Sequence, residues 1–117
     1  MDAPNLTITS EAVDGVEIVV ISGRLDATAS APVKAKFDDV IAGGAHKIGL
    51  DLSGMTYIGS AGLREFFLAG KNLARVNGAM VLFALQPPVQ RIFDISGLPT
   101  SYPIVATRGE ALARLIG

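Results

Sequence analysis

The chain has 117 residues, half of them hydrophobic, and a formal net charge of −1. This length predicts one domain, residues 1–117, with enough apolar side chains to bury a core. The basic residues are scattered along the chain. Nucleic-acid binding is therefore disfavoured, because recognition of a phosphate backbone needs several Lys or Arg on one face.

Other classes of protein are disfavoured by what the sequence lacks. It has no cysteine, which excludes disulfides and thiolate metal sites. No apolar run approaches the roughly 20 residues that a membrane span requires. The N-terminus, Met1-Asp2-Ala3-Pro4, lacks the basic and apolar regions of a signal peptide. We therefore expect a soluble, cytoplasmic protein with no cofactor and no metal.

The N-terminal part predicts an antiparallel β-hairpin. Leu6 and Ile8 alternate with threonines, as in a strand with one buried face. The turn dipeptide Asp14-Gly15 separates this strand from a second apolar run at residues 16–21.

A helix is expected next. Thr28 or Ser30 can cap its N-terminus, and Pro32 is tolerated because it falls in the first turn. Apolar residues then recur at helical spacing until Gly43-Gly44 ends the helix.

The rest of the chain alternates between strands and helices. Expected in order are a strand at about 47–52, a helix at 60–76, a strand at 79–85, a short helix from 87, a strand at 102–107 and a helix at 109–116. Crossovers between parallel strands are right-handed, and ligand-reading loops follow the carboxyl ends of such strands. Ser60 and the segment 25–28 lie at such ends.

Ser60 lies in the run Gly-Ser-Ala-Gly and is a candidate catalytic nucleophile. A serine hydrolase needs a base within hydrogen-bond reach, usually a histidine. The only histidine, His46, precedes the strand at 47–52, which separates it from Ser60 by roughly 20 Å. The run also lacks the Gly-x-Ser-x-Gly spacing. A hydrolase is therefore disfavoured, and His46 is expected in a loop.

The same turn has the glycine spacing of a phosphate-binding loop, from Gly54 to Gly59. Ser60-Ala61 stands where such loops need Lys followed by Ser or Thr, so nucleotide hydrolysis is unsupported. Backbone amides at the helix N-terminus could still favour an anion, which leaves weak nucleotide affinity open.

Ser60 is also expected to act as the N-cap of its helix. One face of this helix is assigned to the core: Leu63, Phe66, Phe67, Gly70, Leu73 and Ala74. Leu68 falls on the opposite face in line with Ser60 and Arg64. It is either an isolated surface leucine or part of a ridge that binds a partner.

Two segments resemble a known family. "LDLSGMTYIGSAGLREF" is similar to the signature of STAS domains, specifically bacterial anti-sigma factor antagonists, and "SGRLDATASAPVKAKF" resembles the family's second marked segment. The resemblance implies a single α/β STAS-like domain without catalytic activity. Its fold would be an N-terminal β-hairpin followed by alternating β-α units, with a mixed sheet of about five strands and about four helices mainly on one face.

The resemblance also implies a regulator of transcription that works by partner switching. In similar proteins, the serine matching Ser60 is phosphorylated by a partner that is both an anti-sigma factor and an ATP-dependent serine kinase. The unphosphorylated antagonist binds that partner and frees the sigma factor, and a metal-dependent phosphatase restores the active form. The alternative is a non-phosphorylated STAS scaffold or transport-accessory module, with weak nucleotide binding as a further option.

Asp26 matches a loop aspartate that lies beside the serine in the family. Gly59 departs from the pattern, because many members have Asp at this position. The residues expected to contact the partner are Asp26, Thr28, Gly59, Ala61, Gly62, Leu63, Arg64 and Leu68.

Overall fold

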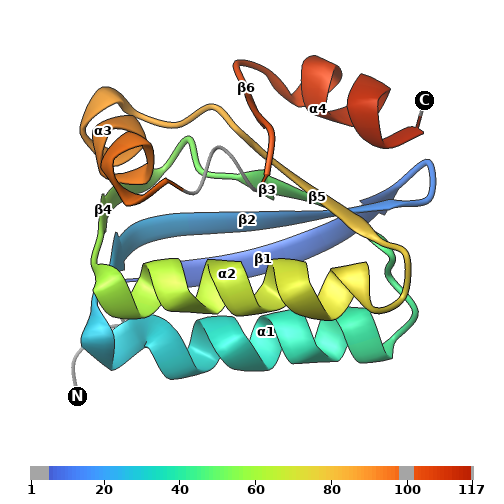
Figure 1. The fold of residues 1–117 in the computed structure, drawn as a ribbon, viewed down its shortest axis with the longest axis horizontal. Coiled ribbons are helices and arrows are strands. Elements are labelled where there is room, and N and C mark those ends of the chain that lie inside the picture. The colour runs from blue at the N-terminus through green and yellow to red at the C-terminus, as the bar shows by residue number, and fades with distance from the viewer. Residues whose placement is uncertain (1–5, 98–101, 117) are drawn as a thin grey trace.

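The computed structural model describes residues 6–97 and 102–116, so the N-terminal segment Met1–Pro4 lies outside the described part (Figure 1). Its first two strands, β1 (Leu6–Val13) and β2 (Val16–Leu25), pair antiparallel along the whole of β1. Asp14 and Gly15 join them with φ values of 51° and 82°. Positive φ at both turn positions is typical of the tight turns that match strand twist. The predicted hairpin is confirmed.

The hairpin forms one side of a mixed six-stranded sheet of order β1-β2-β3-β5-β6, in which β4 also pairs with β2. Beyond the hairpin, all pairings are parallel. The sequence predicted about five strands, and β4 is the additional one. The bounds are β3 (Lys47–Asp51), β4 (Met55–Ile58), β5 (Ala79–Phe83) and β6 (Ile104–Val105).

The helices lie mainly on one face of the sheet, as expected. In Figure 1, α1 (Ser30–Ala42) and α2 (Ser60–Ala74) lie side by side beneath it. The third helix, α3 (Pro87–Ser96), contributes Val89 and Phe93 to the same core. Of the helices in the described residues, only α4 (Arg108–Ile116) covers the opposite face, where Leu115 and Ala111 pack against β2 and β5.

Phe66 of α2 lies at the centre of the larger core. Its ring is fully buried, with its centroid 5.7 Å from that of Phe37 on α1 and 5.9 Å from that of Phe93 on α3. One side chain therefore joins three helices on the same face of the sheet. None of the helices in the described residues is long and apolar enough to cross a membrane.

The predicted core face of α2 is partly wrong. Phe67 is 45% exposed and Ala74 is also exposed, whereas Leu68, expected at the surface, is half-buried. The reason is that α2 packs against α1 as well as the sheet, and α1 covers the side that carries Leu68 and Ala69. The buried stripe is therefore rotated toward α1.

Replacing Phe66 with Ala should lower the free energy of unfolding by about 3–5 kcal/mol, because it empties the space between three helices. Its exposed neighbour is a matched control, and Phe67→Ala should cost less than about 1 kcal/mol. Equilibrium urea denaturation measures both values. Equal losses for the two variants would contradict the packing described here.

Candidate functional site: Ser60 and the loop after β2

Two loops meet where β2 and β4 end. Leu25 and Ile58 are paired in parallel register, and the backbone N–H of Gly59 donates to the carbonyl oxygen of Leu25 at 2.9 Å. Asp26 follows Leu25, and Ser60 follows Gly59. The two segments that the sequence placed at strand ends are therefore held beside each other.

Ser60 is exposed and is the first residue of α2. The N-cap is Gly59, whose extended backbone has φ −104° and ψ −179°, and no side chain caps the helix. The prediction that Ser60 is the N-cap is therefore wrong, because the helix begins one residue too early for its hydroxyl to take that role. Among the described residues, this hydroxyl has no hydrogen-bond partner. It is available to another protein.

The small residues around Ser60 serve different purposes. Gly62 is buried, and a Cβ there would lie 2.5 Å from Cγ of Leu25, so its missing side chain lets α2 approach the end of β2. Gly59 is more open, with Tyr57 Oη 3.2 Å from the position of its Cβ. Ala61 and Leu63 are half-buried. Gly59 and Ala61 are small enough to leave the Ser60 hydroxyl accessible. Gly62 fixes the position of that hydroxyl, because it lets the start of α2 pack against Leu25.

Asp26 organises the neighbouring loop. Its Oδ1 accepts hydrogen bonds from the backbone N–H of Thr28 at 3.0 Å and from Thr28 Oγ1 at 2.6 Å, which caps the short 3₁₀ turn Ala27–Ala29. The bond from the Thr28 hydroxyl is the largest cause that lowers the pKa of Asp26, and nearby Arg24 adds to it. Asp26 therefore carries its negative charge at neutral pH.

The predicted cap of α1 is wrong for both candidates. Thr28 donates to Asp26, and Ser30 Oγ donates to the carbonyl oxygen of Ala27 at 3.1 Å. The N-cap of α1 is Ala29, whose methyl group cannot accept a hydrogen bond, and both neighbouring hydroxyls are engaged in the preceding 3₁₀ turn. Pro32 does lie in the first turn, as expected.

The two elements that form the site, α2 and β2, each carry an exposed arginine. Arg64 is exposed one helical turn further along α2, and Arg24 is exposed on β2, with its guanidinium carbon 4.4 Å from the ring centroid of Tyr57. Neither arginine forms an ion pair within the part of the chain that the structure describes. The sequence analysis missed Arg24 and Tyr57, because their contact depends on the pairing of β2 with β4, which local alternation does not show.

Leu68 does not form an exposed ridge with Ser60 and Arg64. It lines a cavity of about 80 Å³ between α1 and α2, with Phe37 and Lys34 among its neighbours. Leu68 is half-buried beside this cavity, and its contact with a partner stays a prediction.

The catalytic and phosphate-loop interpretations also fail on geometry. His46 is exposed in the loop before β3, at the opposite end of the sheet from Ser60. The residues between Gly54 and Gly59 form β4 and pair with β2, so they cannot wrap a phosphate as a loop. Across the described residues, no group of three or more His, Cys, Asp or Glu side chains could hold a metal ion.

Comparison with known proteins agrees with this arrangement. The family model described as "STAS domain" matches residues 7–111. The anti-sigma F factor antagonist of Paenibacillus polymyxa is 34% identical over 112 residues, which cover 95% of this chain and 96% of that protein.

Solved structures show the same fold. A crystal structure of an anti-sigma factor antagonist from Mycobacterium paratuberculosis superimposes with a TM-score of 0.90 at 26% identity, covering 100% of both chains. Unphosphorylated SpoIIAA, also an anti-sigma factor antagonist, has a TM-score of 0.83 at 26% identity over 95% of this chain and 97% of its own. A structure of Bacillus SpoIIAA in the phosphorylated form matches with a TM-score of 0.72 at 25% identity, over 92% of this chain and 98% of its own. On its sequence, its strand order and these matches, this protein belongs to the STAS domain family.

Proposed function

We propose that this protein is an anti-sigma factor antagonist that binds an anti-sigma factor and so releases the sigma factor, and that phosphorylation of Ser60 switches it off. The main support for the proposal is the hydroxyl of Ser60, which is exposed at the first residue of α2 and has no hydrogen-bond partner among the described residues. Relatives that share the fold along the whole chain are named anti-sigma factor antagonists, and the SpoIIAA domain is known in phosphorylated and unphosphorylated forms.

The docking surface that we propose combines the two loops. Asp26 and Thr28 supply a fixed carboxylate and hydroxyl, and Ser60 lies beside them with Arg64 one turn away. Gly59 and Ala61 contribute contacts of low bulk and Leu63 contributes an apolar contact, while buried Gly62 acts by holding α2 against Leu25. Leu68 lies about two turns beyond Ser60 and is half-buried, so it contributes at the margin of this surface.

Phosphorylation of Ser60 should leave the domain folded. The phosphate adds a charge of about −1.5 to −2 at a helix N-terminus, which the helix dipole favours. Arg64 lies at i+4 and can pair with it, since its guanidinium has no ion pair among the described residues. The modification therefore acts on the interface rather than on the fold.

The partner would bear the cost of the added charge. A dianion enclosed in a close-packed interface loses its water, and without a cation opposite it this costs several kcal/mol. A loss of about 4 kcal/mol corresponds to roughly a thousandfold in affinity, which is sufficient for a switch.

The enzymes of the switch belong to the partners. We propose that the anti-sigma factor is itself the serine kinase and that a metal-dependent phosphatase removes the phosphate. The only histidine, His46, lies at the opposite end of the sheet from Ser60, and the described residues contain no metal-binding cluster, so the domain's own contribution is to present the hydroxyl. Many members of the family have Asp at the position of Gly59. Here a kinase that approaches Ser60 would meet the bare backbone of Gly59 and the ring of Tyr57.

A Ser60→Asp variant should bind the cognate anti-sigma factor roughly a thousandfold more weakly than the wild type, because the carboxylate is desolvated in the interface. Ser60→Ala should bind within about threefold of the wild type, since a methyl group is tolerated where the hydroxyl lies. Isothermal titration calorimetry measures all three affinities.

Thr107→Asp is the matched control for added charge at a helix N-terminus. Thr107 Oγ1 accepts the backbone N–H of Glu110 at 3.1 Å at the start of α4, and Asp can keep that cap. This variant should bind like the wild type because α4 covers the other face of the sheet. A Ser60→Asp variant that binds as tightly as this control would contradict the proposed switch.

Incubation with the anti-sigma factor and ATP should phosphorylate Ser60 stoichiometrically, because this hydroxyl is exposed and unbonded. Peptide mass spectrometry should find one phosphate at Ser60 and none in the Ser60→Ala variant. Ser53, whose hydroxyl donates to Asp51 at 2.7 Å, is an internal control that should stay unmodified. Tight binding without any phosphorylation would instead identify a non-phosphorylated STAS scaffold.

A further inference from the structure

The outer edge of β1 has no partner strand within the described residues. β1 pairs with β2 along one side for all eight residues. Proteins usually protect such edges with Lys, Pro or bulges. Residues 6–10 read Leu-Thr-Ile-Thr-Ser, without charge or proline, and the only charge on β1 is Glu11, which Arg108 pairs at 3.4 Å. The backbone donors and acceptors of this edge are therefore open to an added strand.

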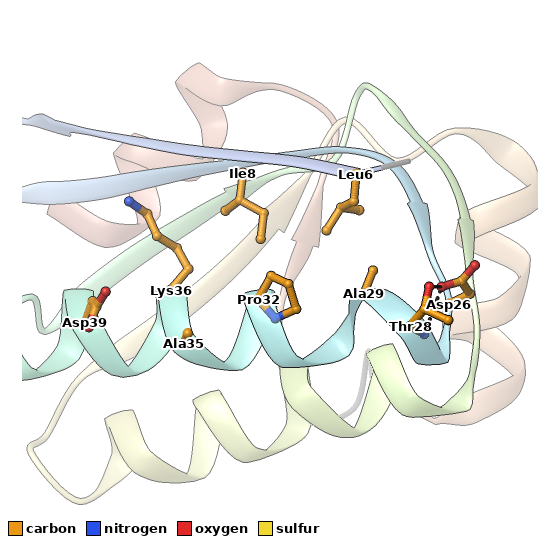
Figure 2. Close-up of a pocket in the computed structure, with 9 residues that line it drawn as sticks. All are labelled: Leu6, Ile8, Asp26, Thr28, Ala29, Pro32, Ala35, Lys36 and Asp39. Carbon is orange, nitrogen blue, oxygen red and sulfur yellow. Dashed lines mark hydrogen bonds between the residues drawn. The ribbon is translucent and has the colours of Figure 1, made fainter. Parts of the chain in front are cut away.

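A groove of about 590 Å³ lies directly under this edge, between β1 and α1 (Figure 2). Leu6 and Ile8 point from β1 toward α1, while Ala29, Pro32 and Ala35 line the opposite wall. Side chains alternate between the two faces of a strand, so a strand added to β1 would place every second side chain in this groove. The walls fit apolar side chains at those positions.

Charged residues mark the two ends of the groove. Asp26, with Thr28, lies at one end, and Lys36 and Asp39 lie at the other. The lining therefore carries two carboxylates and one ammonium, and the ammonium is at the end away from Asp26. Arg24 acts on Asp26 from outside this lining, so within the groove the distribution favours an occupant with a positive charge at the Asp26 end.

The same charges disfavour a second copy of this chain as the occupant. β1 contains no basic residue, so pairing of β1 with its own copy brings no cation toward Asp26. The groove follows α1 from Ala29 to Asp39, about 15 Å at the helical rise, which an extended peptide covers with about five residues.

We propose that β1 and this groove bind an extended segment of another protein, with apolar side chains at alternate positions and Arg or Lys at the end that meets Asp26. The segment adds to the sheet next to β1 by main-chain hydrogen bonds, and its alternate side chains enter the groove. This site shares Asp26 and Thr28 with the proposed docking surface around Ser60, but it extends along β1 and α1 and does not require phosphorylation of Ser60.

The probe is a fluorescein-labelled acetylated peptide, Arg-Thr-Val-Thr-Val-Thr, in which Arg and both Val share one face of the extended chain. It is titrated with the full chain and followed by fluorescence anisotropy. We expect saturable binding, and binding about tenfold weaker when Glu replaces Arg, because the carboxylate of Asp26 then repels the peptide. In an Asp26→Asn variant this preference for Arg over Glu should largely disappear. A Glu peptide that binds the wild type as tightly as the Arg peptide would overturn the proposal.

Two alanines of α1 provide the steric test. Ala35→Phe fills the groove and should weaken binding at least about tenfold, whereas Ala42→Phe, at an exposed position of α1 outside the lining, should leave it unchanged. Equal affinities of these two variants, with circular dichroism showing both folded, would overturn the proposal.

Amide hydrogen exchange tests the added strand without any substitution. Peptide binding should slow exchange at the β1 amides that point away from β2, at least about tenfold, because they become main-chain donors. Unchanged exchange along β1 would refute strand addition. Sedimentation of the free protein as a dimer that Ala35→Phe makes monomeric would identify a second copy as the occupant and overturn the proposal.

Discussion

The parallel pairing of β4 with the end of β2 determines where Ser60 lies. It aligns Leu25 with Ile58, and the hydrogen bond from Gly59 to Leu25 carries the alignment one residue beyond β4. Gly62 then lets the first turn of α2 pack on Leu25, where a Cβ would approach Cγ to 2.5 Å. The start of α2 is therefore fixed by contacts that depend on two glycines and one short strand.

The rest of the core holds α2 in that position. Phe66 lies between aromatic rings of α1 and α3, and Tyr102 donates from its hydroxyl to the carbonyl oxygen of Phe67 at 3.0 Å. Tyr102 packs directly on Gly70, where any side chain would collide with its ring. Since the helix is supported along its length, charge added at its first residue meets a rigid element, and the fold absorbs little of the effect.

The sequence predicted what depends on local pattern. The hairpin could be predicted from alternation in β1 and from the Asp14-Gly15 turn. Helical spacing after Ser60 helped to predict the order of elements, and the two segments that resemble STAS domains identified the family. The missed strand β4 is four residues long with two exposed side chains, so it shows no continuous apolar run. Its pairing with β2 joins residues far apart in the chain, which periodicity cannot show.

The errors in the site have the same origin. Hydrophobicity does not show which neighbouring helix will cover a side chain. Phe67 was expected in the core and is exposed, whereas Leu68 was expected at the surface and is half-buried beside α1. The preference of Ser for the N-cap was correct as a tendency, yet the extended backbone at Gly59 takes that place. Asp26 was placed correctly beside Ser60, because both follow strands that end at the same edge of the sheet.

The hydrogen bonds between Asp26 and Thr28 have a kinetic consequence. They set the loop in one shape before any encounter, so a visiting protein finds its contact surface already assembled and no ordering step precedes association. A surface assembled in advance removes one step that would otherwise slow association, so orientation of the two proteins sets the rate at which they dock.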